Sequence, residues 1–360
     1  MLLGSTGSIG VNALAIARRF GINVEVLVAG NNSTLLQKQI DEFKPSKVVV
    51  STKEVLKKIK HDNISYGEEA ILEAIEESKS EVVVNALVGF LGLKPTLKAI
   101  ECGKKLALAN KESLVVAGAF IDTANITPID SEHFGLWYLL NQRKIKKMTI
   151  TASGGAFRDK SYEFMKNATL EDVLKHPNWS MGQKITIDSA TMINKMFELI
   201  EAHWLFKDKF QNAPVFDAII ETKSIIHAFV DFFDGSTTAH LAYADMKLPI
   251  AFALGFGDKE EILKPIDLCE IGSLEFRKID TQRYIAWEIK DDILKNPKKG
   301  VIINAANEMA IEKFLKKECG FLDIPKKIID AYGKFECVKL QSIDDVFQTD
   351  VEVREYVKNT

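Results

Sequence analysis

Two carboxylates, Asp130 and Glu132, lie two residues apart in the stretch ITPIDSEH (126–133), where an apolar strand pattern gives way to a helical one. Side chains two apart on an extended chain share one face, so this pair could hold a cation. Acidic residues at a helix N-terminus also complement the helix dipole, and Ser131 is well placed to cap the helix that follows. Taken alone, the stretch favours a metal site and a pair of helix-end acids about equally.

A second segment, DSATMINKMFELIE (188–201), supplies a third carboxylate. If it is a helix, Asn194 and Glu198 stand together at i and i+4, away from an apolar stripe made by Met192, Met196, Leu199 and His203. With no cysteine nearby, Asp130, Glu132 and Glu198 would form a hard oxygen site suited to Mg²⁺ or Mn²⁺. The alternative is an exposed Lys195–Glu198 ion pair worth about 0.2–0.5 kcal/mol.

Two loops carry side chains suited to binding an anion or covering a substrate. Ser153 follows the alternating strand pattern MTITA (148–152) and begins a Ser-Gly-Gly turn whose hydroxyl and N–H groups could bind an anion, although a plain glycine turn is the alternative. The loop HPNWSMG (176–182) combines His176, Trp179 and Met181. We expect this loop to act as a lid over a substrate; the alternative is a loop docked on the core by its tryptophan.

A glycine-rich turn, GSTGSIG (4–10), lies between the first strand and the first helix. Such turns let backbone N–H groups and a helix N-terminus approach a pyrophosphate, although a tight strand-to-helix turn would look similar. The second strand ends at Gly30-Asn31-Asn32, with no acid to take a ribose 2′-hydroxyl. This favours NADPH over NADH.

The surrounding pattern predicts the elements that position these residues. Short β-rich runs alternate with helical segments up to about residue 125, which is typical of a Rossmann-like, doubly wound parallel sheet and so of an α/β fold. Longer strand patterns follow, with a hairpin at Asp234-Gly235, and then a helical tail. We expect four segments: an N-terminal α/β domain (1–130), an α+β domain (131–255), a linker (256–275) and a C-terminal helical bundle (276–360).

Composition limits the partners. The 360-residue chain has a formal net charge of −3, with lysines and arginines scattered, which argues against nucleic acid and anionic membranes. No apolar run reaches the roughly 20 residues of a membrane span. The four cysteines are far apart and no secretory leader precedes the first strand, so we expect a cytoplasmic protein.

Seven motifs together make the chain resemble the 1-deoxy-D-xylulose 5-phosphate reductoisomerase family. They occur in order over nearly the whole length: GSTGSIG (4–10), LANKESLV (108–115), PIDSEH (128–133), ASGGAF (152–157), HPNWSMG (176–182), DSATMINKMFE (188–198) and ANEMA (306–310). The family commonly has a basic residue where Asn31 stands, which bears on the strength of the NADPH preference.

The resemblance implies roles for individual residues. The implied metal ligands are Asp130, Glu132 and Glu198, and the implied catalytic group adds His176 and Lys111. The implied substrate contacts are Ser131, Glu132, Ser153, His176, Trp179, Ser189, Asn194, Lys195 and Glu198. The implied cofactor contacts are Gly4, Thr6, Gly7, Ser8, Ile9, Gly30, Asn31, Asn32, Asn110, Lys111, Glu112, Met181 and Gly182.

The function expected from the resemblance is the rearrangement and reduction of a sugar phosphate, 1-deoxy-D-xylulose 5-phosphate, to 2-C-methyl-D-erythritol 4-phosphate in non-mevalonate isoprenoid biosynthesis. The resemblance implies that residues 1–130 bind NADPH and that residues 131–255 form the catalytic domain, which uses Mg²⁺ or Mn²⁺ and forms a homodimer. It also implies that residues 276–360 are a four-helix bundle. One alternative is another NAD(P)-dependent dehydrogenase, of the homoserine or semialdehyde type. A non-catalytic nicotinamide sensor is the second; neither alternative needs three chelating carboxylates.

Overall fold

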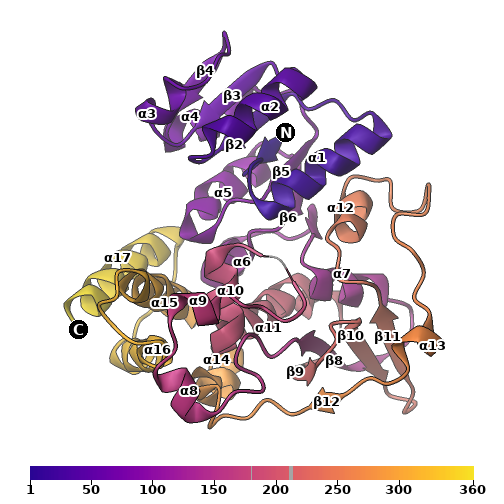
Figure 1. Cartoon of the computed structure of the whole chain (residues 1–360), viewed down its shortest axis with the longest axis vertical. Helices are drawn as coiled ribbons and strands as arrows, with labels where there is room; N and C mark the ends of the chain where they lie inside the picture. The colour runs from indigo at the N-terminus through magenta and orange to yellow at the C-terminus, as the bar shows by residue number, and fades with distance from the viewer. Residues whose placement is uncertain (180, 211–213) are drawn as a thin grey trace. The chain divides into compact units, whose positions relative to one another are not determined.

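The computed structural model describes residues 1–179, 181–210 and 214–360, which divide into two compact units (Figure 1). Unit 1 comprises residues 1–113, 122–134 and 245–264. Unit 2 comprises residues 114–121, 135–244 and 265–360. The domain boundaries predicted from the sequence stay predictions.

Unit 1 is built on a parallel sheet in the order β4-β3-β2-β1-β5-β6-β7. Its strands are β1 (Leu2–Leu3), β2 (Val26–Ala29), β3 (Lys47–Val50), β4 (Ile64–Tyr66), β5 (Val82–Asn85), β6 (Lys105–Leu108) and β7 (Ile126–Pro128). The central strands are almost wholly buried because helices cover both faces of a doubly wound sheet, which explains their valine- and leucine-rich sequences. The predicted Rossmann-like sheet is confirmed.

The helices of unit 1 follow its strands in sequence. They are α1 (Ser8–Phe20), α2 (Ser33–Phe43), α3 (Lys53–Leu56), α4 (Glu68–Glu77), the 3₁₀ turn η1 (Gly89–Gly92), α5 (Leu93–Glu101) and α12 (Lys247–Ala253). Helix α12 comes from a late excursion of the chain, and aromatic contacts fix it: Phe252 packs on Phe134 and Phe256 stacks on Phe20. Residues 245–264 therefore pack as part of unit 1.

Two helices contain the boundary between the units, α6 (Lys111–Ala117) and α7 (Ser131–Tyr138). Each begins in unit 1, directly after the carboxyl end of a strand, β6 and β7 respectively. The first turns of these helices carry Lys111 and Glu132, two of the predicted site residues. In open parallel sheets, ligands bind beyond this edge.

Unit 2 contains a mixed sheet in the order β11-β10-β8-β9-β12. Its strands are β8 (Ile145–Ala152), β9 (Val215–Glu221), β10 (Ile226–Phe232), β11 (Thr237–Leu241) and β12 (Phe276–Arg277). The hairpin expected at Asp234-Gly235 is confirmed, because it joins the antiparallel pair β10 and β11. Strand β9, which pairs in parallel with β8, is an addition to the strands predicted from the sequence.

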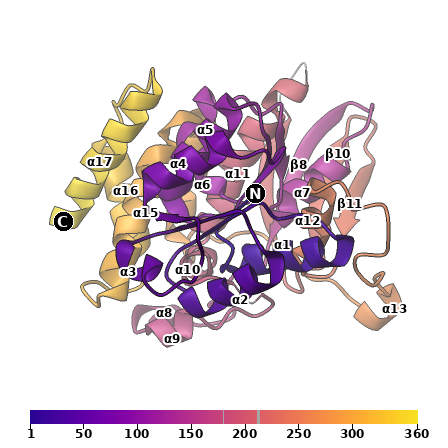
Figure 2. The same ribbon diagram turned by 90° about the horizontal axis from the view of Figure 1, so that it is seen from above.

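The remaining elements of unit 2 are helical. They are η2 (Gly118–Phe120), α8 (Tyr162–Lys166), α9 (Leu170–Val173), α10 (Gln183–Thr191), α11 (Ile193–Phe206), η3 (Lys207–Lys209), α13 (Leu268–Ile271), η4 (Ile285–Ile289), α14 (Lys290–Lys295), η5 (Pro297–Lys299), α15 (Gly300–Leu315), α16 (Asp323–Lys334) and α17 (Ile343–Asn359). Helices α15, α16 and α17 lie side by side in both ribbon views, which confirms a helical C-terminal region (Figure 2).

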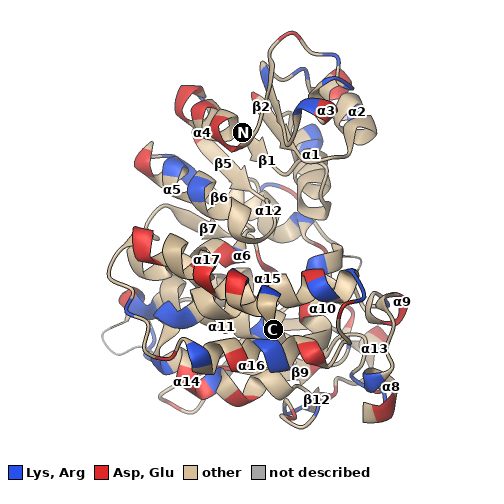
Figure 3. Ribbon diagram, turned by 90° about the vertical axis from the view of Figure 1, so that its left-hand side faces the viewer, with Lys and Arg blue, Asp and Glu red and all other residues tan. Residues whose placement is uncertain are grey.

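Charges of both signs are interspersed on these helices, as on α16 (Figure 3). Within the ranges that the structure describes, no helix has the length and apolarity needed to cross a membrane.

Candidate active site

Asp130 and Glu132 stand where β7 ends and α7 begins, and an oxygen of one carboxylate lies within 4.8 Å of an oxygen of the other. The Nζ of Lys111 donates to Asp130 Oδ2 at 2.7 Å, and both side chains are about nine-tenths buried. Asp130 Oδ1 accepts the backbone N–H of Glu132 at 3.2 Å. The predicted cap residue was therefore wrong: Asp130, and not Ser131, accepts the N–H, because α7 already begins at Ser131, whose hydroxyl donates to Glu132 Oε2.

His133 joins this cluster, although it was not among the predicted ligands. Its ring is fully buried, and Nδ1 lies 3.4 Å from Asp130 Oδ1. A histidine one turn after an N-terminal aspartate can contact that aspartate, so the spacing in DSEH was the available signal.

Glu198, the third predicted ligand, lies in α11 of unit 2 and is almost fully buried. One carboxylate oxygen accepts from Asn194 Nδ2 at 2.5 Å and the other from the Nζ of Lys195. The exposed ion pair considered as an alternative is thus excluded, since the Lys195 and Glu198 side chains are only 5% and 1% exposed. These two donors hold the buried carboxylate in a fixed orientation.

The segment that carries Glu198 is not the single helix expected. Helix α10 ends at Thr191, Met192 adopts a left-handed conformation with φ 68°, and α11 begins at Ile193. A bulky residue at positive φ is uncommon and points to a tertiary constraint at this position. Because of this break, Ser189 on α10 and Asn194 on α11 do not lie on one continuous helix.

Ser153 and His176 contact each other in unit 2, and the network fixes the tautomer of the histidine. His176 Nδ1 accepts the backbone N–H groups of Asn178 and Trp179 at 3.2 and 2.9 Å, so Nδ1 carries no proton. The proton is on Nε2, which donates to Ser153 Oγ at 2.9 Å. The N–H of Gly155 donates to the same Oγ at 3.1 Å. Because Ser153 Oγ accepts from two donors, its own hydrogen is directed toward another acceptor, and a bound anion could be that acceptor.

The Ser153 turn also packs tightly against α10. Gly155 has φ +67°, and a Cβ there would come within 2.6 Å of Ser189 O and 2.7 Å of Ala190 Cα. Only glycine lets the two backbones come this close. The positive charge of Lys195 acts on His176, so Ser153, His176, Ser189 and Lys195 form one neighbourhood.

Burial, together with the charges of Arg158 and Lys195, lowers the pKa of His176 from 6.5 to about 4. A histidine with a depressed pKa in the folded state contributes stability that is present above the unfolded pKa and is lost as pH falls toward the folded one. We therefore expect the contacts of His176 to persist from neutral pH to about pH 5 and to break near pH 4, when Nδ1 can no longer accept. An NMR titration of the His176 ring measures this; a midpoint near 6.5 would contradict the buried, neutral ring.

The other predicted lid residues are placed in part. The Trp179 ring packs edge-on against His227, with ring centroids 6.3 Å apart. Met181 is half-buried, and Gly182 is the residue before α10. Ser180, within the predicted lid, lies outside the described residues.

The glycine turn after β1 has the geometry of an anion cradle. Gly4 has φ +86°, and a Cβ there would meet the Ala86 carbonyl oxygen at 2.4 Å; a Cβ on Gly10 would meet Gly4 O at 2.3 Å. Gly7 precedes the 13-residue helix α1 with no side-chain cap, so the first N–H groups of the helix remain available to a ligand. Thr6, Ser8 and Ile9 complete this turn.

Asn31 and Asn32 have local partners. Asn31 Oδ1 accepts the Ser51 hydroxyl at 2.9 Å, and Asn32 caps α2 by accepting Leu35 N at 3.1 Å. Both side chains, like Gly30, are exposed at the end of β2. They are therefore accessible to a nucleotide.

Asn110 is buried, and its side chain forms hydrogen bonds to neighbouring parts of the protein. Its amide donates to the carbonyl oxygens of Leu87 and Gly89, and its Oδ1 accepts the N–H of Ser113. Glu112 lies beside it, at 3.3 Å. These contacts position the start of α6, and with it Lys111.

Family models of known proteins match the chain along most of its length. Three family models match it: "1-deoxy-D-xylulose 5-phosphate reductoisomerase" over residues 1–118, its C-terminal domain over residues 126–206, and "DXP reductoisomerase C-terminal domain" over residues 241–356. Together these ranges take in most of the chain.

Relatives that carry the name 1-deoxy-D-xylulose 5-phosphate reductoisomerase match over the full length. The protein from Nautilia profundicola is 60% identical, and the protein from Campylobacter hominis is 50% identical; each match covers 100% of this chain and 99% of the relative. A solved DOX-P reductoisomerase in complex with NADPH, fosmidomycin and magnesium has 33% identity and a TM-score of 0.92, covering 99% of this chain and 97% of that one. The Zymomonas mobilis enzyme in complex with NADPH gives a TM-score of 0.85 at 32% identity, with the same coverage.

Proposed function

The chain belongs to the 1-deoxy-D-xylulose 5-phosphate reductoisomerase family, and from that premise we propose that it converts this sugar phosphate to 2-C-methyl-D-erythritol 4-phosphate. The reaction uses NADPH and a divalent cation and belongs to the non-mevalonate route to isoprenoids. The observation that carries the proposal is that the chain holds buried carboxylates oriented by lysine and asparagine donors, and also a serine turn whose hydroxyl accepts from two N–H donors.

NADPH fits unit 1. A side chain at Gly4 or Gly10 would clash with the backbone, so the turn needs glycine at both positions. The N-terminus of α1 offers N–H donors to a pyrophosphate. When bound, the dinucleotide supplies the hydride that reduces the rearranged aldehyde. The chain's part is to hold the pyrophosphate through Thr6, Gly7, Ser8 and Ile9 and to present the ribose end to Asn31.

The donor chemistry of Asp130, Glu132 and Glu198 fits Mg²⁺ or Mn²⁺, because all three offer hard carboxylate oxygens. When bound, the cation supplies Lewis acidity toward the substrate's ketone and a neighbouring hydroxyl. The part of the protein is to orient these ligands. Lys111 and the N–H of Glu132 hold Asp130, and Asn194 and Lys195 hold Glu198.

The phosphate of the substrate would lie on unit 2. We assign its contacts to Ser153, Ser189, Asn194 and Lys195, with His176 and Trp179 above it. Lys195 donates to Glu198, and its positive charge suits a nearby phosphate. Since the phosphate does not react, its binding energy goes into orienting the reacting end.

The test of the function is NADPH oxidation with 1-deoxy-D-xylulose 5-phosphate as substrate. We expect turnover with Mg²⁺ or Mn²⁺, loss of turnover on adding a chelator, and recovery when the metal is restored. Absence of turnover with either metal supplied would overturn the assignment, and turnover that a chelator leaves unchanged would overturn the metal's role.

Asn31→Asp tests the cofactor end. The added carboxylate repels a 2′-phosphate and can accept from a free ribose hydroxyl, so the preference should move from NADPH toward NADH by about tenfold or more. The ratio of kcat/KM for the two cofactors measures this. Asn63→Asp, on an exposed asparagine beyond α3, is the matched control; an unchanged ratio in Asn31→Asp would remove this residue from the site.

We also propose that the chain works in the cytoplasm as a homodimer. The four cysteines, Cys102, Cys269, Cys319 and Cys337, are free, as in proteins of reducing compartments. Phe233, at the end of β10, is 67% exposed and is the kind of side chain that a subunit contact covers. Light scattering at micromolar concentration gives the mass; a monomer would contradict the dimer.

A further inference from the structure

Arg158 holds two backbone carbonyls at once. It follows the Ser-Gly-Gly turn, and its side chain is 15% exposed. Its Nη1 donates to Ser153 O at 2.8 Å and to Thr222 O at 2.9 Å, while its Nε donates to Asp159 Oδ2 at 2.9 Å. A planar guanidinium can serve these three acceptors in fixed directions, whereas an ammonium cannot.

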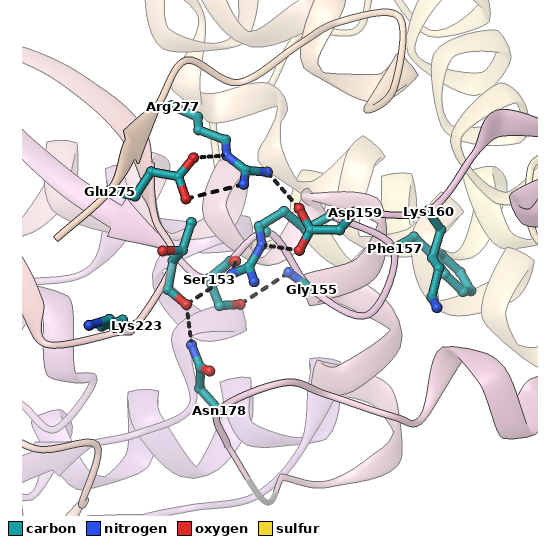
Figure 4. Close-up of polar contacts among 12 residues, drawn as sticks. Ser153, Gly155, Phe157, Asp159, Lys160, Asn178, Lys223, Glu275 and Arg277 are labelled. Atoms are coloured by element: carbon teal, nitrogen blue, oxygen red, sulfur yellow. Dashed lines mark hydrogen bonds and ion pairs between the residues drawn. The ribbon is translucent and has the colours of Figure 1, made fainter. Parts of the chain in front are cut away.

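A chain of ion pairs keeps this guanidinium oriented from outside (Figure 4). Asp159 Oδ1 accepts from Arg277 Nη1 at 2.6 Å. Arg277 also donates to both carboxylate oxygens of Glu275, at 2.8 and 3.2 Å. The two arginines hold the pKa of Asp159 below its usual value, so the link stays charged.

The hydrogen bonds of Arg158 also connect it to the loop that carries His176. Asn178 Nδ2 donates to Thr222 O at 3.0 Å and to Ser224 Oγ at 2.8 Å. Thr222 O therefore accepts from both Arg158 and Asn178. One carbonyl thus ties the Ser153 turn to the His176 loop.

The turn is shaped around this arginine. Gly154 has φ +86°, and a Cβ there would come within 2.7 Å of Arg158 Cγ. The charge of Arg158 also contributes to the lowered pKa of His176, so it helps to keep that ring neutral. A neutral ring is what allows Nδ1 to accept from the loop while Nε2 donates to Ser153.

We propose that Arg158 is a positioning residue for the phosphate end of the substrate: by holding the Ser153 and Thr222 carbonyls, it sets the Ser153 hydroxyl and the His176 loop in register. The inference rests on the proposed function, in which Ser153 contacts the phosphate. Arg277 and Glu275 act through Arg158 and touch neither Ser153 nor His176.

The test measures KM for the sugar phosphate and for NADPH separately. Arg158→Lys keeps the charge but loses the planar guanidinium that donates in fixed directions. We therefore expect KM for the sugar phosphate to rise about tenfold while KM for NADPH stays unchanged. A merely structural role would lower the thermal midpoint and the active fraction without this split. Arg354→Lys is the matched control, because Arg354 is also largely buried and paired with two carboxylates, on α17; it should leave both KM values unchanged.

Two further variants separate the possible failures. Arg158→Gln removes the charge, so the pKa of His176 should rise from about 4 toward 6.5, whereas Arg158→Lys should leave it low. Ser153→Ala should raise KM for the sugar phosphate by itself. A wild-type KM in Arg158→Lys with a raised KM in Ser153→Ala overturns the positioning role alone; wild-type values in both overturn the phosphate assignment.

Should Arg158 variants fail to fold, Arg277→Gln gives the same answer from the outer end of the chain. The Arg277 side chain is 39% exposed, and its acidic partners among the described residues are Asp159 and Glu275. We expect a rise of about threefold in KM for the sugar phosphate and none for NADPH. No rise, in a folded variant, would overturn the proposal.

Discussion

Asp130→Asn should lower kcat/KM by about a thousandfold and raise the metal concentration needed for half-maximal rate. The substitution keeps an oxygen that can accept the Glu132 N–H but removes one anionic ligand. It also leaves Lys111 with a buried charge and no carboxylate at 2.7 Å. Steady-state rates at several Mg²⁺ or Mn²⁺ concentrations measure both effects.

A matched substitution separates the ligand role from the helix-end role. Asp267 also precedes a short helix, α13, and accepts the N–H groups of Cys269 and Glu270, but it is exposed. Asp267→Asn should leave the rate and the metal response unchanged. Near wild-type turnover in Asp130→Asn would contradict its role as a ligand.

Gly155→Ala is the second change with a large expected effect. The added Cβ meets Ser189 O at 2.6 Å on a backbone at φ +67°, so the Ser153 turn must move away from α10. We expect a loss of about 1–3 kcal/mol in the free energy of unfolding. We also expect a rise in KM for the sugar phosphate, because Ser153 loses the N–H donated by Gly155.

Gly235→Ala is the control for that change. Gly235 has φ +90° in the β10–β11 hairpin, but a Cβ there meets nothing within 4 Å. It should show the cost of positive φ without a change in KM. Equal KM values in the two variants would show that the approach of the Ser153 turn to Ser189 does not matter for binding.

Much of the fold follows from local sequence. The runs around Val26–Ala29, Lys47–Val50 and Lys105–Leu108 are strands because continuous valine, leucine and alanine suits a sheet buried on both faces. The Asp234-Gly235 turn was readable because a hairpin turn needs a residue at positive φ.

Features that depend on tertiary contacts were less readable. The segment 188–201 has helical periodicity throughout, yet the helix is interrupted at Met192, because packing against distant residues sets the left-handed conformation there. No motif in the sequence points to Arg158, and only the folded chain brings Thr222, from beyond β9, to its guanidinium. His133 is not among the ligands predicted from the sequence, and only the folded chain shows its ring buried beside Asp130.

The most direct test of the account is Mn²⁺ binding to the chelator-treated protein, measured by titration calorimetry or by the Mn²⁺ electron paramagnetic resonance signal, without substrate. Asp130→Asn, Glu132→Gln and Glu198→Gln should each weaken binding by about tenfold or more, because each removes one anionic oxygen ligand. Glu312→Gln, on the exposed face of α15, should bind as the wild type does. Wild-type affinity in any of the three ligand variants, with the fold intact, would contradict a single cation held by Asp130, Glu132 and Glu198.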